Sequence, residues 1–310
     1  MARSFRFSVS LGSIGDPAEL VATARRAADL GYSGVTLPDH LDEQVGPLVG
    51  LTAVAASCPD LTLTTLVLAN DYRHPAVLAK EVASLDRFSG GRVELGVGAG
   101  WMTADYERAG IPFDRPGVRI ARLAEALDVL DGCFGDGPFD HEGTHYTIRG
   151  LDSLPKPVQR PRPRLLVAGG GPRILGLAAR RADIVGINPG LAAGVIDARA
   201  GSTATPAATD DKLRVVRENA GARFGDLELQ TRVHLAALTD DRHAMAAALA
   251  PALGIDPDDA LDSPHALVGS VDQCVDTVRR WRDRWGLSYV TWGVDAMETM
   301  APVVERLAGT

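Results

Sequence analysis

Short apolar runs alternate along the chain with longer amphipathic segments. The runs typical of strands end near Leu11, Leu37, Leu68, Val97, Ala168, Ile187, Leu238 and Trp292. Apolar residues at helical spacing occupy the segments 17–30, 48–57, 75–88, 118–134, 173–181, 211–224, 240–253, 271–285 and 297–307. Eight strands that alternate with helices predict a (β/α)8 TIM barrel of class α/β, and a doubly wound sheet is the alternative.

The alternation is interrupted over residues 135–164, where glycine, proline and aromatic residues replace the helical spacing. Phe139, Tyr146 and Ile148 favour a β-hairpin, and four prolines after it exclude regular structure. We interpret this segment as an insertion over the carboxyl-terminal face of the strands, where insertions shape substrate pockets, and a solvated excursion is the alternative. We expect residues 1–310 to form one domain, because barrels of this length occur as one domain.

Composition narrows the class of partner. With 32 Lys and Arg against 40 Asp and Glu, the net charge is −8, so we expect a small-molecule substrate and neither nucleic acid nor a membrane as partner. Residues 1–12 alternate apolar and polar side chains, which is typical of a strand and not of a signal peptide. Cys58, Cys133 and Cys274 are widely spaced and match no metal motif, so the sequence favours a cytoplasmic protein without a metal.

A carboxylate and an imidazole are adjacent where the second predicted strand ends. Asp39 and His40 directly follow the apolar run 32–37 and Pro38. The carboxyl ends of the strands carry the catalytic groups of barrel enzymes, and a loop there faces a pocket rather than a core. The pair is therefore the first candidate for catalysis, and a hydrogen-bonded loop histidine is the alternative for His40.

Alternate glycines occupy the end of the fourth predicted strand: Gly96, Gly98 and Gly100. Glycine costs stability within a strand, so this end predicts the close approach of a flat ligand or of another backbone segment. Simple crowding at a barrel corner explains the pattern equally well. Trp101 follows directly and is a candidate wall of the pocket.

A second group of glycines follows the strand that ends near residue 168: Gly169, Gly170 and Gly171. Pro172 suits the first position of the helix that comes next. Free amides at a helix start, with Arg173 beside them, can hold the phosphate of a nucleotide-like cofactor. A glycine run is also an ordinary tight turn, so this segment alone leaves both interpretations open.

Residues 141–145, His-Glu-Gly-Thr-His, match the zinc-protease pattern HExxH. The pattern binds zinc only on a helix, where both histidines share one face. Gly143 and Thr144 are poor helix formers, and the next residues favour a strand. We therefore expect no zinc catalysis from this segment.

In combination these segments resemble the bacterial luciferase-like flavin superfamily. The likeness is carried by Asp39-His40, by YRHPAVLAK at residues 72–80, by SGGRVELGVGAGW at 89–101 and by PKPVQRP at 155–161. It covers nearly the whole chain. Within the superfamily the chain looks most like the actinobacterial branch that uses the deazaflavin coenzyme F420.

The resemblance implies a tricyclic cofactor that lies across the carboxyl ends of the strands, with its phosphate on the amides of residues 169–173. It also implies a non-prolyl cis peptide near Leu66 and Val67 that supports the ring, and it implies that Asn70 and Asp71 point toward the cofactor or the substrate. The implied cofactor-binding residues are Asp39, Leu66, Val67, Asn70, Gly98, Gly100, Trp101, Gly169, Gly170, Gly171 and Arg173.

Carried over by position, His40 would act near the reactive ring carbon as a proton donor or an orienting hydrogen-bond partner, since imidazole titrates near working pH. Asp39 would hold His40 in one tautomer or accept hydrogen bonds from the cofactor. Relatives that oxidise sugar phosphates carry a glutamate where this chain has Trp101. We therefore expect a more apolar pocket that favours reduction of a conjugated carbon-carbon or imine bond.

The sequence leaves three functions open. The preferred one is a coenzyme F420-dependent oxidoreductase, expected to be a homodimer, that transfers a hydride between the deazaflavin and a small organic substrate. The first alternative is an FMN-dependent monooxygenase that uses O2 and a partner reductase. The second alternative is a barrel that binds the cofactor without catalysis, which would need residues 169–173 but not His40.

Overall fold

Parallel strands form a closed barrel in the computed structural model, which describes residues 3–191, 194 and 198–310. Around the barrel the strands are β1 (Arg6–Ser10), β2 (Gly34–Leu37), β3 (Thr62–Thr65) continued by β4 (Leu68–Ala69), β5 (Val93–Gly98), β8 (Arg164–Gly169), β9 (Ile184–Ile187), β10 (Glu228–Arg232) and β13 (Leu287–Gly293). The ring closes because β13 pairs with β1 and β3 pairs with β5. Since β3 and β4 share one position, the barrel has eight strand positions, and the predicted (β/α)8 fold is confirmed.

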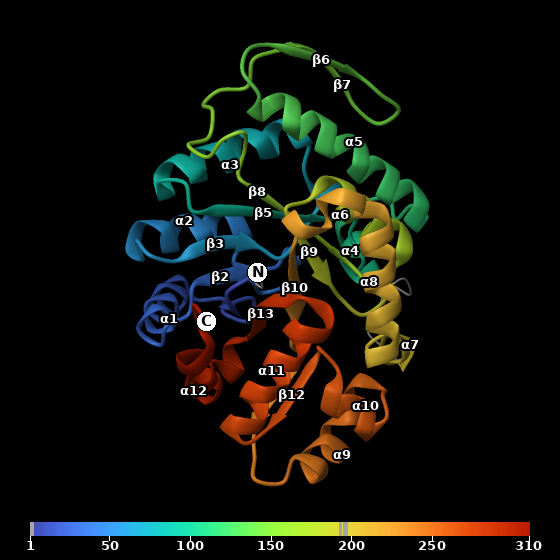
Figure 1. The fold of residues 1–310 in the computed structure, drawn as a ribbon. Helices are drawn as coiled ribbons and strands as arrows, with labels where there is room; N and C mark the ends of the chain where they lie inside the picture. Colours follow the sequence, from blue (N-terminus) through green and yellow to red (C-terminus); the bar gives the residue numbers. More distant parts are fainter. Residues whose placement is uncertain (1–2, 192–193, 195–197) are drawn as a thin grey trace.

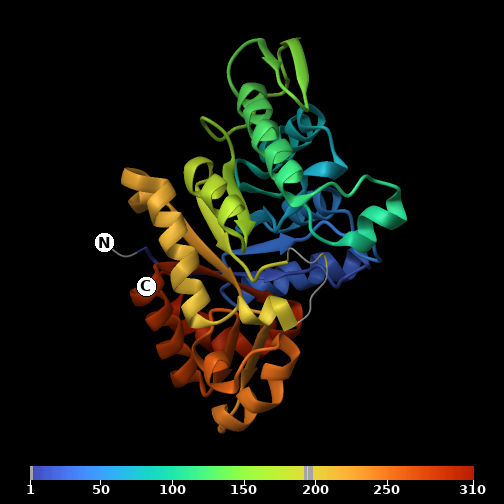
Figure 2. The same cartoon turned by 90° about the vertical axis from the view of Figure 1, so that its right-hand side faces the viewer.

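Helices connect successive strands and surround the barrel (Figure 1; Figure 2). The connecting helices are α1 (Pro17–Asp29), α2 (Pro47–Ser57), α3 (Pro75–Ser89), α5 (Pro116–Phe134), α6 (Pro172–Arg181), α8 (Pro206–Ala220) and α11 (Val271–Trp285), and α12 (Met297–Leu307) follows the last strand. Local sequence sets their ends: in α1 the Asp16 side chain accepts a hydrogen bond from the Glu19 amide, and Pro17 occupies the first turn. Leu20, Ala24 and Ala27 then form the buried stripe.

The loops of the barrel contain further short elements. They are α4 (Thr103–Ala109), α7 (Ala198–Ser202) and the 3-10 turns η1 (Asn70–Tyr72), η2 (Gly221–Asp226) and η3 (Val294–Ala296). Helix α8 begins at Pro206, before the predicted start at residue 211, because the Thr205 side chain caps it. Among the described residues, no helix combines the length and the apolar character needed to cross a bilayer.

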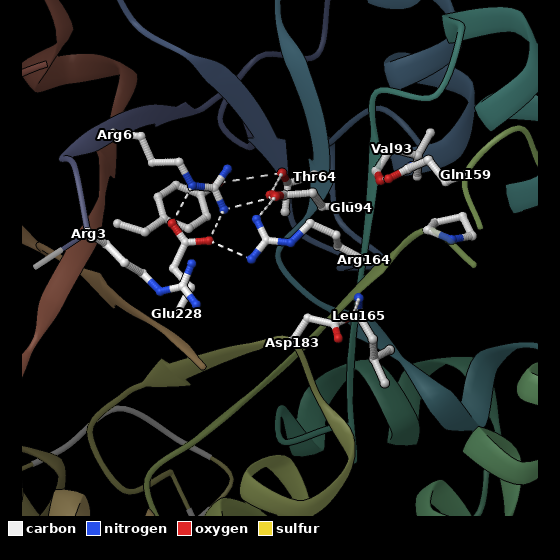
Figure 3. Close-up of polar contacts among 12 residues, drawn as sticks. Arg3, Arg6, Thr64, Val93, Glu94, Gln159, Arg164, Leu165, Asp183 and Glu228 are labelled. Atoms are coloured by element: carbon white, nitrogen blue, oxygen red, sulfur yellow. Dashed lines mark hydrogen bonds and ion pairs between the residues drawn. The ribbon is translucent and has the colours of Figure 1, made fainter. Parts of the chain in front are cut away.

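Four charged side chains close the amino-terminal end of the barrel (Figure 3). The Arg6 guanidinium donates to both carboxylate oxygens of Glu228, at 2.6 and 2.9 Å, and lies 2.8 Å from Glu94. Arg164 contacts the same two carboxylates at 3.2 and 2.8 Å. A hollow of about 480 Å³ at this end is lined by these paired charges, so the network acts as a plug rather than as a binding site.

The seventh barrel strand is β10, and the prediction that this strand ends near Leu238 is wrong. The apolar run ending there is β11 (Leu235–Leu238), which pairs with β12 (Ala266–Gly269) in a separate small sheet. Together with α9 (Arg242–Leu253) and α10 (Pro257–Asp262) these strands form a second insertion, between β10 and α11 (Figure 1). The sequence pattern did not predict β10, because Glu228, Gln230 and Thr231 interrupt its apolar run.

The predicted hairpin is present as β6 (Phe139–Glu142) and β7 (Thr147–Leu151). It lies along the outside of α5 (Figure 1), where the Glu125 carboxylate accepts hydrogen bonds from the amides of residues 144–146. His141 lies on β6, 3.3 Å from Glu125, so the HExxH segment is extended and not helical, as predicted. No residue of the insertion 135–164 lines the cavity described next.

Candidate functional site

A cavity of about 940 Å³ lies at the carboxyl-terminal ends of the barrel strands. Of the residues predicted for the site, the cavity is lined by Asp39, His40, Leu66, Val67, Gly98, Gly100, Trp101, Gly169, Gly170, Gly171 and Arg173. Segments that are distant in the sequence thus meet because parallel strands present their carboxyl ends on one face. This clustering is what a site built on a barrel requires.

His40 is held by a carboxylate that the sequence interpretation missed. Its Nδ1 lies 2.8 Å from Oδ2 of Asp105, on α4. A carboxylate accepts the Nδ1 proton, which fixes the tautomer and leaves Nε2 for another partner. The Trp101 ring meets the imidazole edge-on, with 5.6 Å between centroids. His40 is therefore oriented from two sides.

Tyr72 extends this arrangement. Its hydroxyl donates to Oδ2 of Asp105 at 3.5 Å. Burial, with the nearby charge of Asp105, raises the pKa of Tyr72 well above its ordinary value, so the phenol stays a donor at neutral pH. Asp105 thus receives hydrogen bonds from both His40 and Tyr72, although no sequence motif surrounds it.

Asp39 contacts Arg73 and not His40. The Arg73 guanidinium donates to its two oxygens at 2.6 and 2.9 Å, and the Ala69 amide donates to Oδ2 at 3.0 Å. The expectation that Asp39 holds His40 in one tautomer is therefore corrected: Asp105 occupies that place. Asp39 instead ties Ala69 at the end of β4, and Arg73 after it, to the end of β2.

The Leu66–Val67 peptide between β3 and β4 is cis, as expected. The alternate glycines of β5 make room for this bulge: a Cβ on Gly96 would lie 1.8 Å from the Thr65 carbonyl oxygen, and one on Gly98 would lie 2.8 Å from the Val67 side chain. Of the two original explanations, close approach of another backbone segment accounts for Gly96. Leu66 and Val67 in turn line the cavity.

Asn70 and Asp71 do not line the cavity, and their side chains have partners elsewhere. The Asn70 side chain donates to the Tyr146 hydroxyl of the hairpin at 3.2 Å. Asp71 accepts from Arg122 at 2.8 Å and from the Tyr106 hydroxyl at 3.0 Å. Both side chains are used to anchor η1 against α5 and its neighbours.

The glycines after β8 form a backbone cradle. A Cβ on Gly170 would lie 2.4 Å from the Pro189 carbonyl oxygen, whereas a Cβ on Gly171 would meet open space. Gly171 precedes α6 without a side-chain cap, so the first amides of that helix remain available. Arg173 is exposed at the same helix start. These features fit an anionic group better than they fit a turn with only a structural role.

The cavity wall opposite Leu66 and Val67 carries polar groups that the sequence interpretation missed. Arg232, at the end of β10, donates to Ser10 Oγ at 3.1 Å, and His234 lies beside it in the cavity lining. Partial desolvation at the cavity wall, with the charge of Arg232, lowers the pKa of His234, so its imidazole is neutral at neutral pH. A charged residue inside a barrel strand was the available signal for Arg232.

Fold and site together define a (β/α)8 barrel with a large cavity at the carboxyl-terminal ends of its strands. The chain belongs to the luciferase-like monooxygenase family, whose model matches residues 1–288. The resemblance proposed from the motifs is thereby confirmed.

Two of the relatives are named for different cofactors. The chain is 33% identical over 175 residues to F420-dependent glucose-6-phosphate dehydrogenase of Beutenbergia cavernae, covering 54% of this chain and 51% of the relative. It is 30% identical over 131 residues to the FMNH(2)-dependent dimethylsulfone monooxygenase of Pseudomonas putida, covering 42% and 36%. The chain thus spans about half or less of these relatives' lengths.

A solved structure supports the fold over the full length. The coenzyme F420-dependent tetrahydromethanopterin reductase of Methanopyrus kandleri superposes with a TM-score of 0.79, covering 98% of this chain and 100% of that one. At 18% sequence identity this likeness concerns the barrel and not the reaction.

Proposed function

We propose that this protein is a coenzyme F420-dependent oxidoreductase that transfers a hydride to or from a small organic substrate. The observation that carries the proposal is that an anion cradle and an oriented imidazole line the same cavity: the amides from Gly171 onward, and His40 on Asp105. The relative named an F420-dependent glucose-6-phosphate dehydrogenase adds support for the choice of cofactor.

The residues present fit such a cofactor. Gly171 leaves open space beside the free amides of α6, where a phosphate group would be held with Arg173. Leu66, Val67 and Trp101 give the cavity apolar walls for a flat ring system. When bound, the deazaflavin supplies a two-electron hydride donor or acceptor without useful reactivity toward oxygen.

The chain's own groups orient the reactants and handle the proton. His40, fixed through Nδ1 by Asp105, would hold or deliver a proton at Nε2. Trp101 lines the cavity beside His40, and the resemblance implies that it stands where sugar-phosphate-oxidising relatives carry an acid, so an unsaturated carbon-carbon or imine bond is the proposed target. Asp39 and Arg73 would keep the loop after β4 in position.

Fluorescence titration of the purified protein with coenzyme F420 and with FMN, in both oxidation states, tests the proposal. Selective binding of F420, followed by substrate-dependent oxidation of its reduced form, is the expected result. Preference for FMN, together with consumption of oxygen, would contradict the proposal and favour an FMN-dependent monooxygenase, as the dimethylsulfone monooxygenase relative is named. Binding of F420 without any turnover would favour the alternative of a barrel that binds the cofactor without catalysis.

The proposal includes a homodimer in the cytoplasm. Val49 on α2 and Val77 and Phe88 on α3 are large apolar side chains with more than half of their surface exposed, on two helices that pack together. The three cysteines are free and buried, which suits a reducing compartment. Light scattering of the wild type and of Phe88→Asp tests the dimer: a monomeric wild type contradicts it.

A further inference from the structure

Arg232 has fewer hydrogen-bond acceptors than the other buried or half-buried arginines at this end of the barrel. Its one side-chain hydrogen bond within the described part of the chain goes to Ser10 Oγ, a neutral acceptor. Arg73 is paired with Asp39, and Arg122 with both Asp71 and Asp114. Arg119 has no carboxylate partner either, but its guanidinium donates to the carbonyl oxygens of Ala99, Gly100 and Asp114. Among residues 3–191, 194 and 198–310, no carboxylate lies within ion-pair distance of Arg232; Asp295 acts on it only from further away.

The position of Arg232 separates it from the cofactor cradle. Around the barrel, β10 is four strand positions from the β3–β4 position, so Arg232 faces the wall that carries the Leu66–Val67 bulge. Ser10 ends β1, which is likewise four positions from β8 and its glycines. Arg232 and Ser10 therefore line the half of the cavity left for a substrate when a ring system lies on the bulge.

An unpaired guanidinium in this place has a physical cost. Burial opposes its charge and lowers the pKa of Arg232, yet an arginine stays protonated at neutral pH. Donors that are not satisfied by protein acceptors face the cavity, where a planar carboxylate can receive two parallel hydrogen bonds. An anion bound there regains the free energy that burial of the cation costs.

The neighbouring groups narrow the class of anion. His234 is neutral because of its low pKa, so it adds a hydrogen-bonding group without a second positive charge. Asp295, also in the lining, disfavours a doubly charged group. One cation, one hydroxyl and one neutral imidazole match a carboxylate with a single charge rather than a phosphate with two.

We propose that Arg232 binds the carboxylate of the substrate, which places the substrates among small organic acids with an apolar body. This inference rests on the proposed function for the statement that the bound acid is a substrate. The binding site itself depends only on the cavity, on the guanidinium and on its neighbours.

Benzoate and its neutral isostere benzamide are suitable probes, because they share an apolar body and differ in charge. Calorimetric titration of the F420-loaded protein is expected to show benzoate binding at least about tenfold tighter than benzamide. Arg232→Met should abolish the difference, and Arg232→Lys should retain part of it, since lysine keeps the charge but not the planar fork. Arg149→Met, on the exposed strand β7, is the matched control and should behave as the wild type.

Each outcome decides the inference. Equal binding of the two probes by the wild type overturns it, and so does an undiminished preference in Arg232→Met. A tenfold loss of F420 affinity in Arg232→Met would assign the guanidinium to the cofactor and also overturn it. If the wild type binds no F420 but prefers benzoate through Arg232, the carboxylate site stands and the proposed function fails. Should Arg232→Met not fold, Arg232→Lys carries the comparison.

Discussion

His40 Nδ1 and Asp105 Oδ2 lie 2.8 Å apart, although the two residues are 65 positions apart in the sequence. His40 follows β2, and Asp105 lies on the short helix α4 after β5. In the barrel, β3 pairs with β2 on one side and with β5 on the other, so the carboxyl ends of β2 and β5 lie on either side of the cis bulge. His40, the residue proposed for proton transfer, is thereby oriented by Asp105 from another βα unit.

Replacement of His40 by Ala should lower kcat by a factor of about 10² to 10⁴, because a positioned acid or base is removed from the reaction. The affinity for F420 should change little, since the cradle after β8 is untouched. The measurement is the rate of oxidation of reduced F420 with the best substrate found in a screen of unsaturated acids. His243→Ala, an exposed histidine on α9, is the control and should keep full activity. A His40→Ala protein with wild-type turnover would remove His40 from the mechanism.

Replacement of Asp105 by Asn should lower kcat by about 10- to 100-fold through misplacement of the imidazole, with F420 affinity retained. The amide can donate to Nδ1, so the tautomer of His40 should change. Nitrogen-15 NMR of labelled histidine reads this tautomer directly and would not respond to a general loss of stability. Glu107→Gln on the exposed face of α4 is the matched control. An unaltered His40 spectrum in Asp105→Asn contradicts the positioning role.

Adjacent glycines in the cradle should respond differently to the same methyl group. Gly170→Ala should destabilise the protein and weaken cofactor binding, because its Cβ would lie 2.4 Å from the Pro189 carbonyl oxygen. Gly171→Ala should fold normally, since its φ of −99° suits any residue and its Cβ meets open space. Gly171→Asp should weaken F420 by about tenfold or more through repulsion at the helix start. Thermal unfolding and F420 titration of the three variants check this; tight binding by Gly171→Asp would place the phosphate elsewhere.

The buried His265 should make the fold sensitive to acid. Burial lowers the pKa of His265 well below its ordinary value, with the charge of Lys212 adding to the effect. The imidazole takes up a proton on unfolding once the pH is below about 6.5, so the stability that it contributes is complete above that pH and is lost as the pH falls below it.

Urea unfolding between pH 7 and pH 5 measures this loss. The free energy of unfolding should fall with pH more steeply in the wild type than in His265→Asn, whose replaced side chain cannot take up a proton. His243→Asn should retain the wild-type slope, because that histidine is exposed on α9. Parallel slopes for all three proteins would contradict a role for His265.

Local patterns determined most of the elements and several parts of the site. The alternation of apolar runs and helical spacing was sufficient for the barrel, since each strand and each helix follows its own period. The apolar pattern did not reveal β10, because two polar residues interrupt its apolar run. Glu228 belongs to the charged network at the amino-terminal end of the barrel, and Gln230 is buried within the strand. The glycines after β8 were recognisable because a tight turn followed by proline has a local cause.

Contacts between distant segments lay outside what the sequence by itself could determine. It identified Asp39, His40, Trp101 and the glycine cradle, each of which follows a strand end. Only the tertiary structure decided that Asp105 holds His40 while Asp39 is committed to Arg73, and that Arg232 faces the cavity without a carboxylate. The reason is physical: the period of a strand or helix is written in neighbouring residues, whereas side-chain pairing depends on which loops the closed barrel brings together.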